Sequence, residues 1–278
     1  MIKIVEIWGE NFSEALPRIH KCLQNSSLVA MDTEFPGTVN KPLEDIEKGG
    51  EVYFQILRRN VDLLQLIQLG ISFANEIDGK ITITESLQFN FNFNLSRNMF
   101  AQDSIDLLLR SGVDFQNHKK RGILVKTFVN MLRNSSLIFN EKIYWISFHS
   151  GYDFGYLVKI LTDKFLPKNS IDFLRLIQIH FPNFYDVKYL NLFSGNFGGG
   201  LNKLAEKLQI ERIGKLHQAG SDSLLTLSVF EKIKKFYFNG SIERRFKGIL
   251  FGLNNIDLGN FPPESEYIDE EIPNFIIH

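Results

Sequence analysis

A ten-residue stretch near the N-terminus constrains the fold more than any other part of the chain. It is LVAMDTEFPG, residues 28–37, an apolar run typical of a buried strand that ends on Pro and Gly, which favour a turn. Because side chains alternate faces along a strand, Asp32 and Glu34 project from the same face. Two adjacent carboxylates repel each other and lose hydration on burial. A divalent cation between them would offset both costs, although the pattern alone also fits two acids that reach solvent at a strand end.

The composition indicates a soluble intracellular protein with a large core. The chain has 278 residues, 44% of them apolar, including 26 Phe. Its single cysteine, Cys22, excludes an internal disulfide and fits a reducing compartment. No apolar run approaches the roughly 18 residues of a membrane span, and residues 1–6 do not have the form of a signal peptide.

The charge balance limits how nucleic acid could be bound. Lys and Arg total 31 against 32 for Asp and Glu. No global positive field therefore attracts a polyanion, which argues against avid, sequence-independent binding of nucleic acid. The balance still permits an enzyme that holds a few nucleotides through a metal or a small local patch.

Two further acids follow predicted strands or begin predicted helices. Asp153 lies where the strand over residues 143–148 meets a helix, at the edge of a sheet where α/β proteins bind ligands. Asp222 lies in the first turn of a helix predicted to run to about residue 238, where helix capping is the alternative role. His217 precedes Asp222 by five residues, and a histidine can take a proton from an attacking water because imidazole titrates near neutral pH. Four carboxylates and a histidine fit two-metal phosphoryl chemistry if they converge.

Hydrophobic periodicity predicts the other elements. We expect an amphipathic helix over residues 11–25, capped by Asn11 or Ser13, and a long loop over residues 36–52. A continuous apolar strand is predicted over residues 61–73, with a hairpin partner over residues 80–93.

Two more patterns carry specific expectations. Phe89, Phe91 and Phe93 alternate with Asn, so they form one apolar face that is expected to pack in the core rather than stack on bases. Residues 118–132 are predicted to form one helix. No repeat or linker divides the chain, which favours one domain.

Three longer motifs resemble a known enzyme family. They are MDTEFPG at residues 31–37, FHSGYDFGYL at 148–157 and HQAGSDSLLT at 217–226. These resemble the three exonuclease motifs of the DEDD superfamily, and more specifically the Caf1/Pop2 family of Ccr4–Not deadenylase subunits. The likeness extends to NVDLL at 60–64, IQLG at 67–70, AQDSIDLL at 101–108 and YDVKYL at 185–190, and it covers roughly residues 1–253.

The resemblance implies a fold, an activity and a set of roles. The fold would be α/β and RNase H-like, of the DnaQ exonuclease type, with a mixed central sheet flanked by helices. The activity would be 3′-to-5′ poly(A)-specific exoribonuclease action that shortens mRNA tails and releases 5′-AMP, in cytoplasm and nucleus. The roles that the resemblance implies are metal ligands at Asp32, Glu34, Asp153 and Asp222 and general base at His217. Two divalent cations are expected, Mg²⁺ or Mn²⁺ rather than Zn²⁺.

The resemblance also implies partners, and alternatives stay open. The expected partners are a poly(A) RNA 3′ end, a Not1-type scaffold and a Ccr4-type nuclease, with no membrane. One alternative is an adaptor that bridges those two subunits, and another is a DEDD exonuclease acting on other RNA or on DNA. Residues 1–253 are expected to form the ribonuclease domain and residues 254–278 an acidic, Pro-containing tail. Whether a tail acid such as Glu270 reaches the metals stays open.

Overall fold

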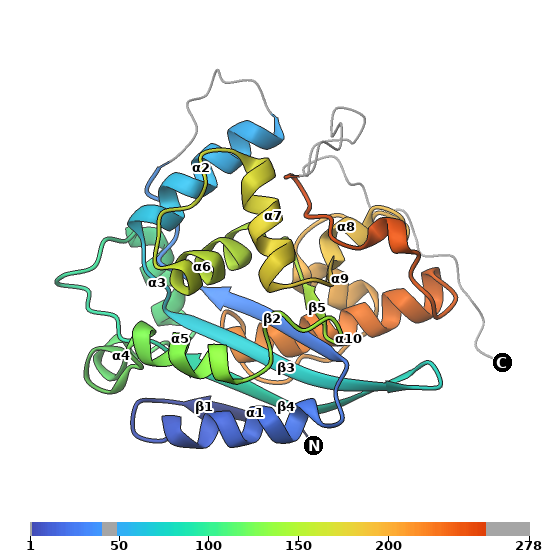
Figure 1. Cartoon of the computed structure of the whole chain (residues 1–278), viewed down its shortest axis with the longest axis horizontal. Helices are drawn as coiled ribbons and strands as arrows, with labels where there is room; N and C mark the ends of the chain where they lie inside the picture. The colour runs from blue at the N-terminus through green and yellow to red at the C-terminus, as the bar shows by residue number, and fades with distance from the viewer. Residues whose placement is uncertain (1, 41–48, 254–278) are drawn as a thin grey trace.

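The computed structural model describes residues 2–40 and 49–253 (Figure 1). The strands are β1 Ile4–Ile7, β2 Leu28–Glu34, β3 Gln68–Ile77, β4 Lys80–Asn90, β5 Tyr144–Ser147 and β6 Phe184–Asp186. The first helices are α1 Ala15–Leu23, α2 Gly50–Leu63, α3 Gln102–Arg110, α4 Phe115–Arg121 and α5 Val125–Asn134. The later ones are α6 Gly151–Thr162, α7 Ser170–His180, α8 Val187–Asn191, α9 Leu201–Lys207 and α10 Ala219–Tyr237. Short 3₁₀ turns occupy Phe12–Glu14 and Arg244–Phe246.

The six strands form one mixed sheet in the order β1-β4-β3-β2-β5-β6. Strand β2 lies inside it, antiparallel to β3 and parallel to β5, and β5 is parallel to β6. The β3–β4 hairpin and β1 complete the other half of the sheet. Strand β5 pairs only with Leu28–Ala30, whereas the pairing with β3 continues to Glu34, so β3 holds the acid-bearing C-terminal end of β2.

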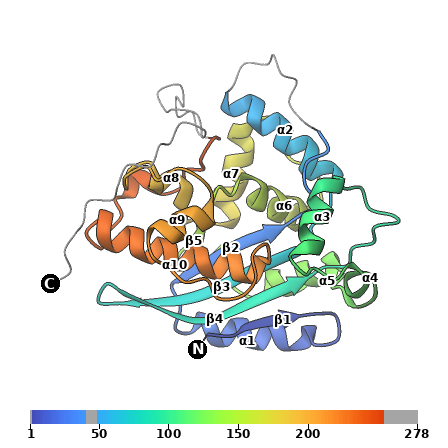
Figure 2. The ribbon, with the colours of Figure 1, turned by 180° about the vertical axis from the view of Figure 1, so that it is seen from behind.

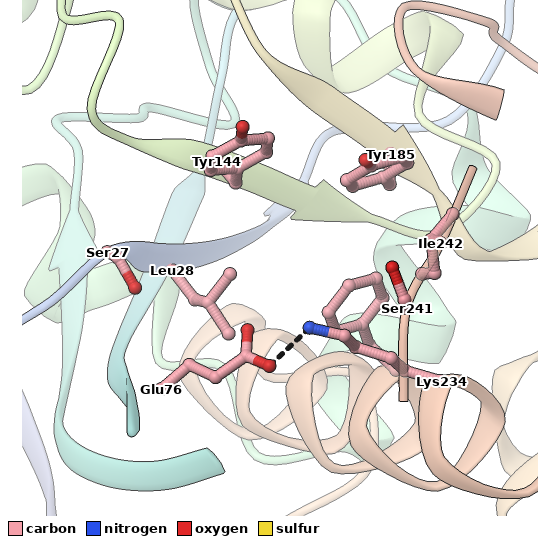
Figure 3. A pocket seen from close by; sticks show the side chains of 9 residues that line it. Ser27, Leu28, Glu76, Tyr144, Tyr185, Lys234, Ser241 and Ile242 are labelled. Atoms are coloured by element: carbon pink, nitrogen blue, oxygen red, sulfur yellow. Dashed lines mark hydrogen bonds and ion pairs between the residues drawn. The ribbon is translucent and has the colours of Figure 1, made fainter. Parts of the chain in front are cut away.

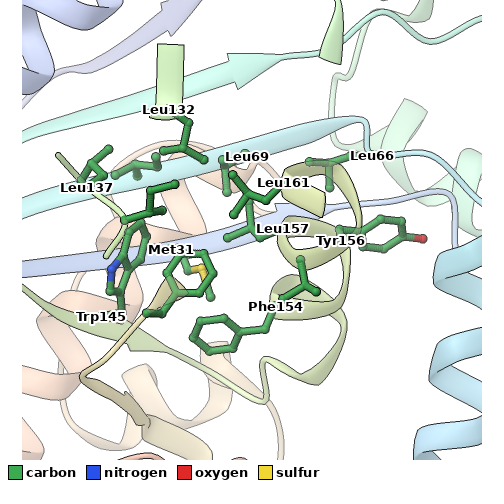
Figure 4. Packing of buried hydrophobic residues seen from close by; sticks show 14 of the residues in the cluster. Met31, Leu66, Leu69, Leu132, Leu137, Trp145, Phe154, Tyr156, Leu157 and Leu161 are labelled. Carbon is green, nitrogen blue, oxygen red and sulfur yellow. The ribbon is translucent and has the colours of Figure 1, made fainter. Parts of the chain in front are cut away.

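The alternation of side chains along β2 divides the core in two. Val29 and Met31 face a core built with α1, α2, α5, α6 and α7, part of which Figure 4 shows around Met31 and Trp145. Leu28 and Ala30 face the opposite side, where they pack against α8, α9 and α10. Figures 1 and 2 show these helix groups on the two faces of the sheet. Asp32 and Glu34 continue the second series and therefore project toward α10.

Most predicted elements are present. The amphipathic helix over 11–25, the strand over 28–34, the hairpin that turns at Asp78–Gly79 and the long C-terminal helix are confirmed. The three alternating phenylalanines are fully buried, so their role is core packing as predicted. The mixed sheet with helices on both faces confirms the predicted α/β class.

Four predictions differ from the structure. Residues 61–73 are not one strand, because α2 ends at Leu63 and β3 starts at Gln68; Phe54, Leu57 and Val61 are buried at helical spacing. The predicted loop over 36–52 accordingly ends at α2, and its residues 41–48 lie outside the described part. Asn11 does not cap a helix, since its amide instead accepts from the Trp8 N–H and donates to the Glu6 carbonyl.

The predicted helix over 118–132 is two helices, α4 and α5. The break occurs because Ile123 pairs with the sheet: its N–H donates to the Asn90 carbonyl and its carbonyl accepts from the Asn92 N–H. At Gly122, an added Cβ would lie 2.4 Å from the Asn92 Cα, so the close approach to Asn92 requires glycine. A strand-like bridge thus interrupts the helical periodicity.

Candidate active site

The structure brings the predicted acids together at the C-terminal end of β2. Carboxylate oxygens of Asp32, Glu34 and Asp222 all lie within 4.8 Å of one another. Asp32 and Glu34 are partly exposed, whereas Asp222 is buried. Asp153 is also buried, and its charge acts on both Asp32 and Glu34. Four carboxylates from three separate segments therefore share one site.

Helix α10 can bring Asp222 close to β2 because the sheet has a glycine where the helix crosses it. Gly70 of β3 pairs with Asp32 in the sheet register. An added Cβ at Gly70 would lie 1.8 Å from the Ala219 carbonyl oxygen, at the start of α10. Only glycine allows the helix backbone to approach the strand this closely.

Two glutamines from the sheet hold the N-terminus of α10. The Gln68 side-chain oxygen accepts from the Ala219 N–H at 3.3 Å, and that of Gln88 accepts from the Gly220 N–H at 3.0 Å. Their amide nitrogens both donate to the Gln218 side-chain oxygen at 3.1 Å. These bonds satisfy helix N–H groups that have no partner within the helix.

Asp153 reaches the site from the other face of the sheet. It lies in the first turn of α6, directly after β5. Thr33 alternates with the two β2 acids, and its hydroxyl donates to Asp153 Oδ1 at 2.6 Å. The buried Asp186 accepts from the His149 N–H at 2.8 Å and from the Phe251 N–H at 3.0 Å. Asp186 thereby fixes the turn that precedes Asp153.

Burial and mutual repulsion shift the pKa values of the four acids. Burial raises the pKa of Asp32 well above its usual range, and the charges of Asp153, Asp222 and Glu34 raise that pKa further. Burial and the charges of Asp222 and Asp153 raise the pKa of Glu34 well above its usual range. Burial raises the pKa of Asp153 to about 6, with the Thr33 hydrogen bond acting in the opposite direction. The pKa of Asp222 is raised by burial, while the charges of Arg212 and His217 lower it.

His217 lies beside Asp222, in the loop between α9 and α10. Its charged form interacts favourably with the Asp222 carboxylate. Its backbone adopts a left-handed conformation with φ of 54°, which is uncommon for a residue with a side chain. The structure thus places the histidine and the acids that the motifs pointed to in one region.

Several residues that build the site were not predicted as site residues. Arg212 donates to Asp222 Oδ1 at 2.7 Å, and Gln68, Gln88 and Asp186 position the segments that bear the acids. Glutamines inside predicted buried strands are the one signal in the sequence that could have indicated a polar role for Gln68 and Gln88. Glu270, the tail acid considered above, lies outside the described residues.

The donor set fits hard divalent cations. Carboxylate oxygens that are crowded and mutually repelling match the ligands that Mg²⁺ and Mn²⁺ prefer. Within residues 2–40 and 49–253, the cluster of Asp32, Glu34 and Asp222 is the only group of three or more His, Cys, Asp or Glu side chains with metal-binding geometry. In the same ranges, no helix is both long and apolar enough to cross a bilayer.

A separate hollow lies at the opposite end of β2. It has a volume of about 270 Å³ and is lined by residues such as Leu28, at the start of that strand. Tyr144 and Tyr185 lie on one side of it, and an ion pair between Lys234 and Glu76 lies on the other (Figure 3). Since Leu28 and Glu34 are the two ends of β2, this hollow is remote from the acids.

Comparison with known proteins identifies the family. The model of the CAF1 family ribonucleases matches residues 7–130. A probable CCR4-associated factor 1 homolog of Arabidopsis thaliana is 44% identical over 257 residues, covering 91% of this chain and 92% of the relative. The chain belongs to the CAF1 family of ribonucleases. The poly(A) ribonuclease pop2 of Schizosaccharomyces pombe is 41% identical, covering 91% of this chain and 75% of the relative.

Solved structures of this family have the same fold. Pop2p of S. pombe, in a form with Mg²⁺ and Mn²⁺ bound, matches with a TM-score of 0.85 and 42% identity, covering 90% of this chain and 99% of that one. A yeast CAF1 co-crystallized with the NOT1 MIF4G domain matches with a TM-score of 0.75 and 28% identity, covering 90% of this chain and 96% of that one. Exonuclease I matches with a TM-score of 0.52 at 12% identity, covering 77% of this chain and 42% of that one, which confirms the predicted DnaQ-type exonuclease fold alone.

Proposed function

We propose that this protein is a 3′-to-5′ poly(A)-specific exoribonuclease that shortens mRNA tails and releases 5′-AMP. The observation that carries the proposal is the convergence of Asp32, Glu34 and Asp222 within 4.8 Å, in a chain that belongs to a ribonuclease family. The 41% identity to a poly(A) ribonuclease supports the substrate class. The acidic cluster favours an enzyme over an adaptor that has no catalytic role.

In this proposal, Asp32, Glu34, Asp153 and Asp222 hold two divalent cations, Mg²⁺ or Mn²⁺. The Mg²⁺ and Mn²⁺ in the Pop2p relative support that choice. Bound cations would supply positive charge that acidifies the attacking water and stabilises the leaving oxygen. The carboxylates orient the site, and a ring nitrogen of His217 takes the proton from the attacking water. Loss of the base in His217→Ala should lower kcat by roughly 10²–10⁴-fold.

We further propose that the protein works in a complex, in cytoplasm and nucleus. The NOT1-bound relative and the CCR4-associated relatives support a Not1-type scaffold and a Ccr4-type nuclease as partners. With a net charge of −1, the chain has little general attraction for RNA, so partners would deliver the substrate. We place the ribonuclease domain at residues 1–253 and treat residues 254–278 as a separate tail.

The test is a competition among oligo(A) RNA, oligo(A) DNA and duplex RNA, incubated with the pure chain and Mg²⁺ or Mn²⁺ at two salt concentrations. The expected result is stepwise shortening of the single-stranded RNA from its 3′ end with release of 5′-AMP. Recognition would come from single-strandedness, base stacking and the 2′-hydroxyl, with only modest salt dependence. Preferred degradation of DNA or duplex would favour another DEDD exonuclease activity. No degradation of any substrate would favour the adaptor role.

A further inference from the structure

Arg212 provides a positive charge in direct contact with the acid cluster. Its Nη2 donates to Asp222 Oδ1 at 2.7 Å and also bonds the Asn202 side-chain oxygen, while Nη1 donates to Ser221 Oγ at 2.8 Å. Only 17% of its side chain is exposed. Asn202 lies in the first turn of α9, and Ser221 and Asp222 lie in the first turn of α10. The planar guanidinium therefore has its donors distributed over three fixed acceptors, a geometry that an ammonium group cannot reproduce.

The same arginine anchors the loop that carries His217. Ser221 Oγ accepts from Arg212 and donates to the Ile213 carbonyl at 2.8 Å, so the start of the loop is tied to the first turn of α10. At its other end, the Gln218 N–H donates to Asp222 Oδ2 at 3.1 Å. Residues 213–216 between these ties are exposed. Packing therefore contributes little there, and the hydrogen bonds around Arg212 fix the path of the loop.

We propose that Arg212 is a positioning residue that sets two parts of the site together: the orientation of the Asp222 carboxylate and the placement of His217. The proposal rests on the proposed function for the role of His217, but the orientation of Asp222 can be measured independently. With Oδ1 bound by Arg212 and Oδ2 by the Gln218 N–H, the carboxylate cannot rotate, and the second lone pair of each oxygen stays available to a cation. Partners of this kind typically contribute 10–100-fold to metal affinity or activity.

The first experiment separates geometry from charge. Arg212→Lys keeps the positive charge but loses the planar fork, and Arg212→Gln removes the charge. Mn²⁺ binding to each purified full-length variant would be measured by electron paramagnetic resonance, alongside kcat and KM on oligo(A). Positioning predicts that both variants lose roughly 10–100-fold in Mn²⁺ affinity and in kcat, with little change in KM. Wild-type Mn²⁺ affinity in Arg212→Lys would overturn the proposal, because charge alone would then be sufficient.

Lys234→Ala provides the control for loss of an ion pair. Lys234 is as buried as Arg212, lies on α10, the helix that bears Asp222, and pairs with Glu76 at the hollow remote from the acids (Figure 3). The Lys234→Ala variant should lose stability without losing Mn²⁺ affinity. If Lys234→Ala weakens Mn²⁺ binding as much as Arg212→Lys does, the effect reflects the stability of α10 and the proposal is wrong.

A second variant separates the two tasks of Arg212. Ser221→Ala removes the hydroxyl that ties Ile213 but leaves the bond between Arg212 and Asp222. It should keep Mn²⁺ affinity and lose roughly 10-fold or more in kcat. Unchanged kcat in Ser221→Ala would overturn the loop half of the proposal. If the wild-type chain degrades no oligo(A) at all, the proposed function fails, whereas the Mn²⁺ comparison still decides the Asp222 half.

Discussion

Asp32 and Asp222 belong to one cluster of carboxylates, but the protein supports them in different ways. Asp32 is at the end of a central strand that rests on apolar cores, and within the described residues it has no ion-pair partner. Asp222 is held by Arg212 and by the Gln218 N–H, and its helix is held by glutamine side chains. The sheet side of the site thus relies on hydrophobic packing, and the α10 side relies on a buried polar network.

The two sides of the site also differ in electrostatic strain. Burial and neighbouring acids raise the pKa of Asp32, and the positive charge of Arg212 lowers that pKa by a smaller amount. Asp222 is also buried, but a contacting guanidinium and a backbone N–H favour its charged form. Without metal, the strand acids therefore oppose folding strongly, whereas at Asp222, whose pKa burial also raises, Arg212 and the Gln218 N–H offset part of that cost.

The largest expected effect comes from neutralising each acid in turn. Asp32→Asn should lose at least about 10³-fold in activity, since removing a proposed metal ligand removes several kcal/mol of transition-state stabilisation. In EDTA its melting temperature should rise by a few degrees, because one repelling charge is gone; 1 kcal/mol corresponds to about 2–4 °C in domains of roughly 150–250 residues. Activity assays and thermal melts check both outcomes.

Asp222→Asn should lose as much activity as Asp32→Asn, but its stability should change in the opposite direction. The substitution leaves the Arg212 charge buried without its carboxylate, which typically costs about 3–5 kcal/mol, and less here because Arg212 keeps Asn202 and Ser221. Its melting temperature in EDTA should therefore fall. If both variants melt above the wild type, the α10 side is as strained as the strand side and the contrast disappears.

The second prediction concerns the contact between the two sides. Gly70→Ala would place a methyl group 1.8 Å from the Ala219 carbonyl, so α10 must move away from β3. We expect a stability loss of about 1–3 kcal/mol from overpacking. We also expect about a 10²-fold loss of kcat, because Asp222 and His217 would move relative to the acids of β2.

Gly200→Ala is the matched control. Gly200 precedes α9, has no positive φ, and an added Cβ there would meet nothing within 4 Å. Its activity and stability should stay near those of the wild type. Retention of wild-type kcat in Gly70→Ala, measured at a temperature where the variant is folded, would show that the α10 side adjusts without loss of function.

The two sides also differ in how far the sequence predicts them. The strand side follows from local pattern: alternation alone places Asp32 and Glu34 on one face, and the structure agrees. The α10 side depends on partners far apart in sequence, such as Gln68 with Ala219 and Gln88 with Gly220. No periodicity links such residues, so the polar network could not be deduced from the chain. The motifs that resembled a family pointed to Asp222 and His217, but not to what holds them.

The errors in the fold have a related cause. In residues 61–73, the sequence is apolar on both sides of the point where α2 ends and β3 begins, so helix and strand periodicities cannot be separated there. The break between α4 and α5 is decided by the pairing of Ile123 with Asn90 and Asn92, which is a tertiary interaction. Local propensity predicted the long elements and failed where a distant strand determines the local conformation.

The smallest expected effect is a pH dependence of stability that originates on the sheet side. The pKa of Asp153 is about 6 in the folded protein, mainly because of burial, against about 3.9 for an unfolded aspartate. Between about pH 4 and pH 6 the folded state therefore binds more protons than the unfolded state, and the free energy of unfolding falls as pH rises, by up to about 1.4 kcal/mol per pH unit.

In EDTA, Asp153→Asn should lack this contribution and should gain stability relative to the wild type as pH rises through this window. Burial lowers the pKa of His118, which gives the opposite slope below about pH 6.5, but equally in both proteins. The difference between their melting curves therefore reports the loss of Asp153 together with its effect on Asp32 and Glu34, whose pKa values the Asp153 charge raises. Asp222→Asn should change the slope less, because Arg212 offsets the effect of burial on Asp222. Parallel wild-type and Asp153→Asn curves from pH 4 to 6 would mean that the sheet side is not strained at Asp153, and the contrast with α10 would then rest on Asp32 and Glu34 alone.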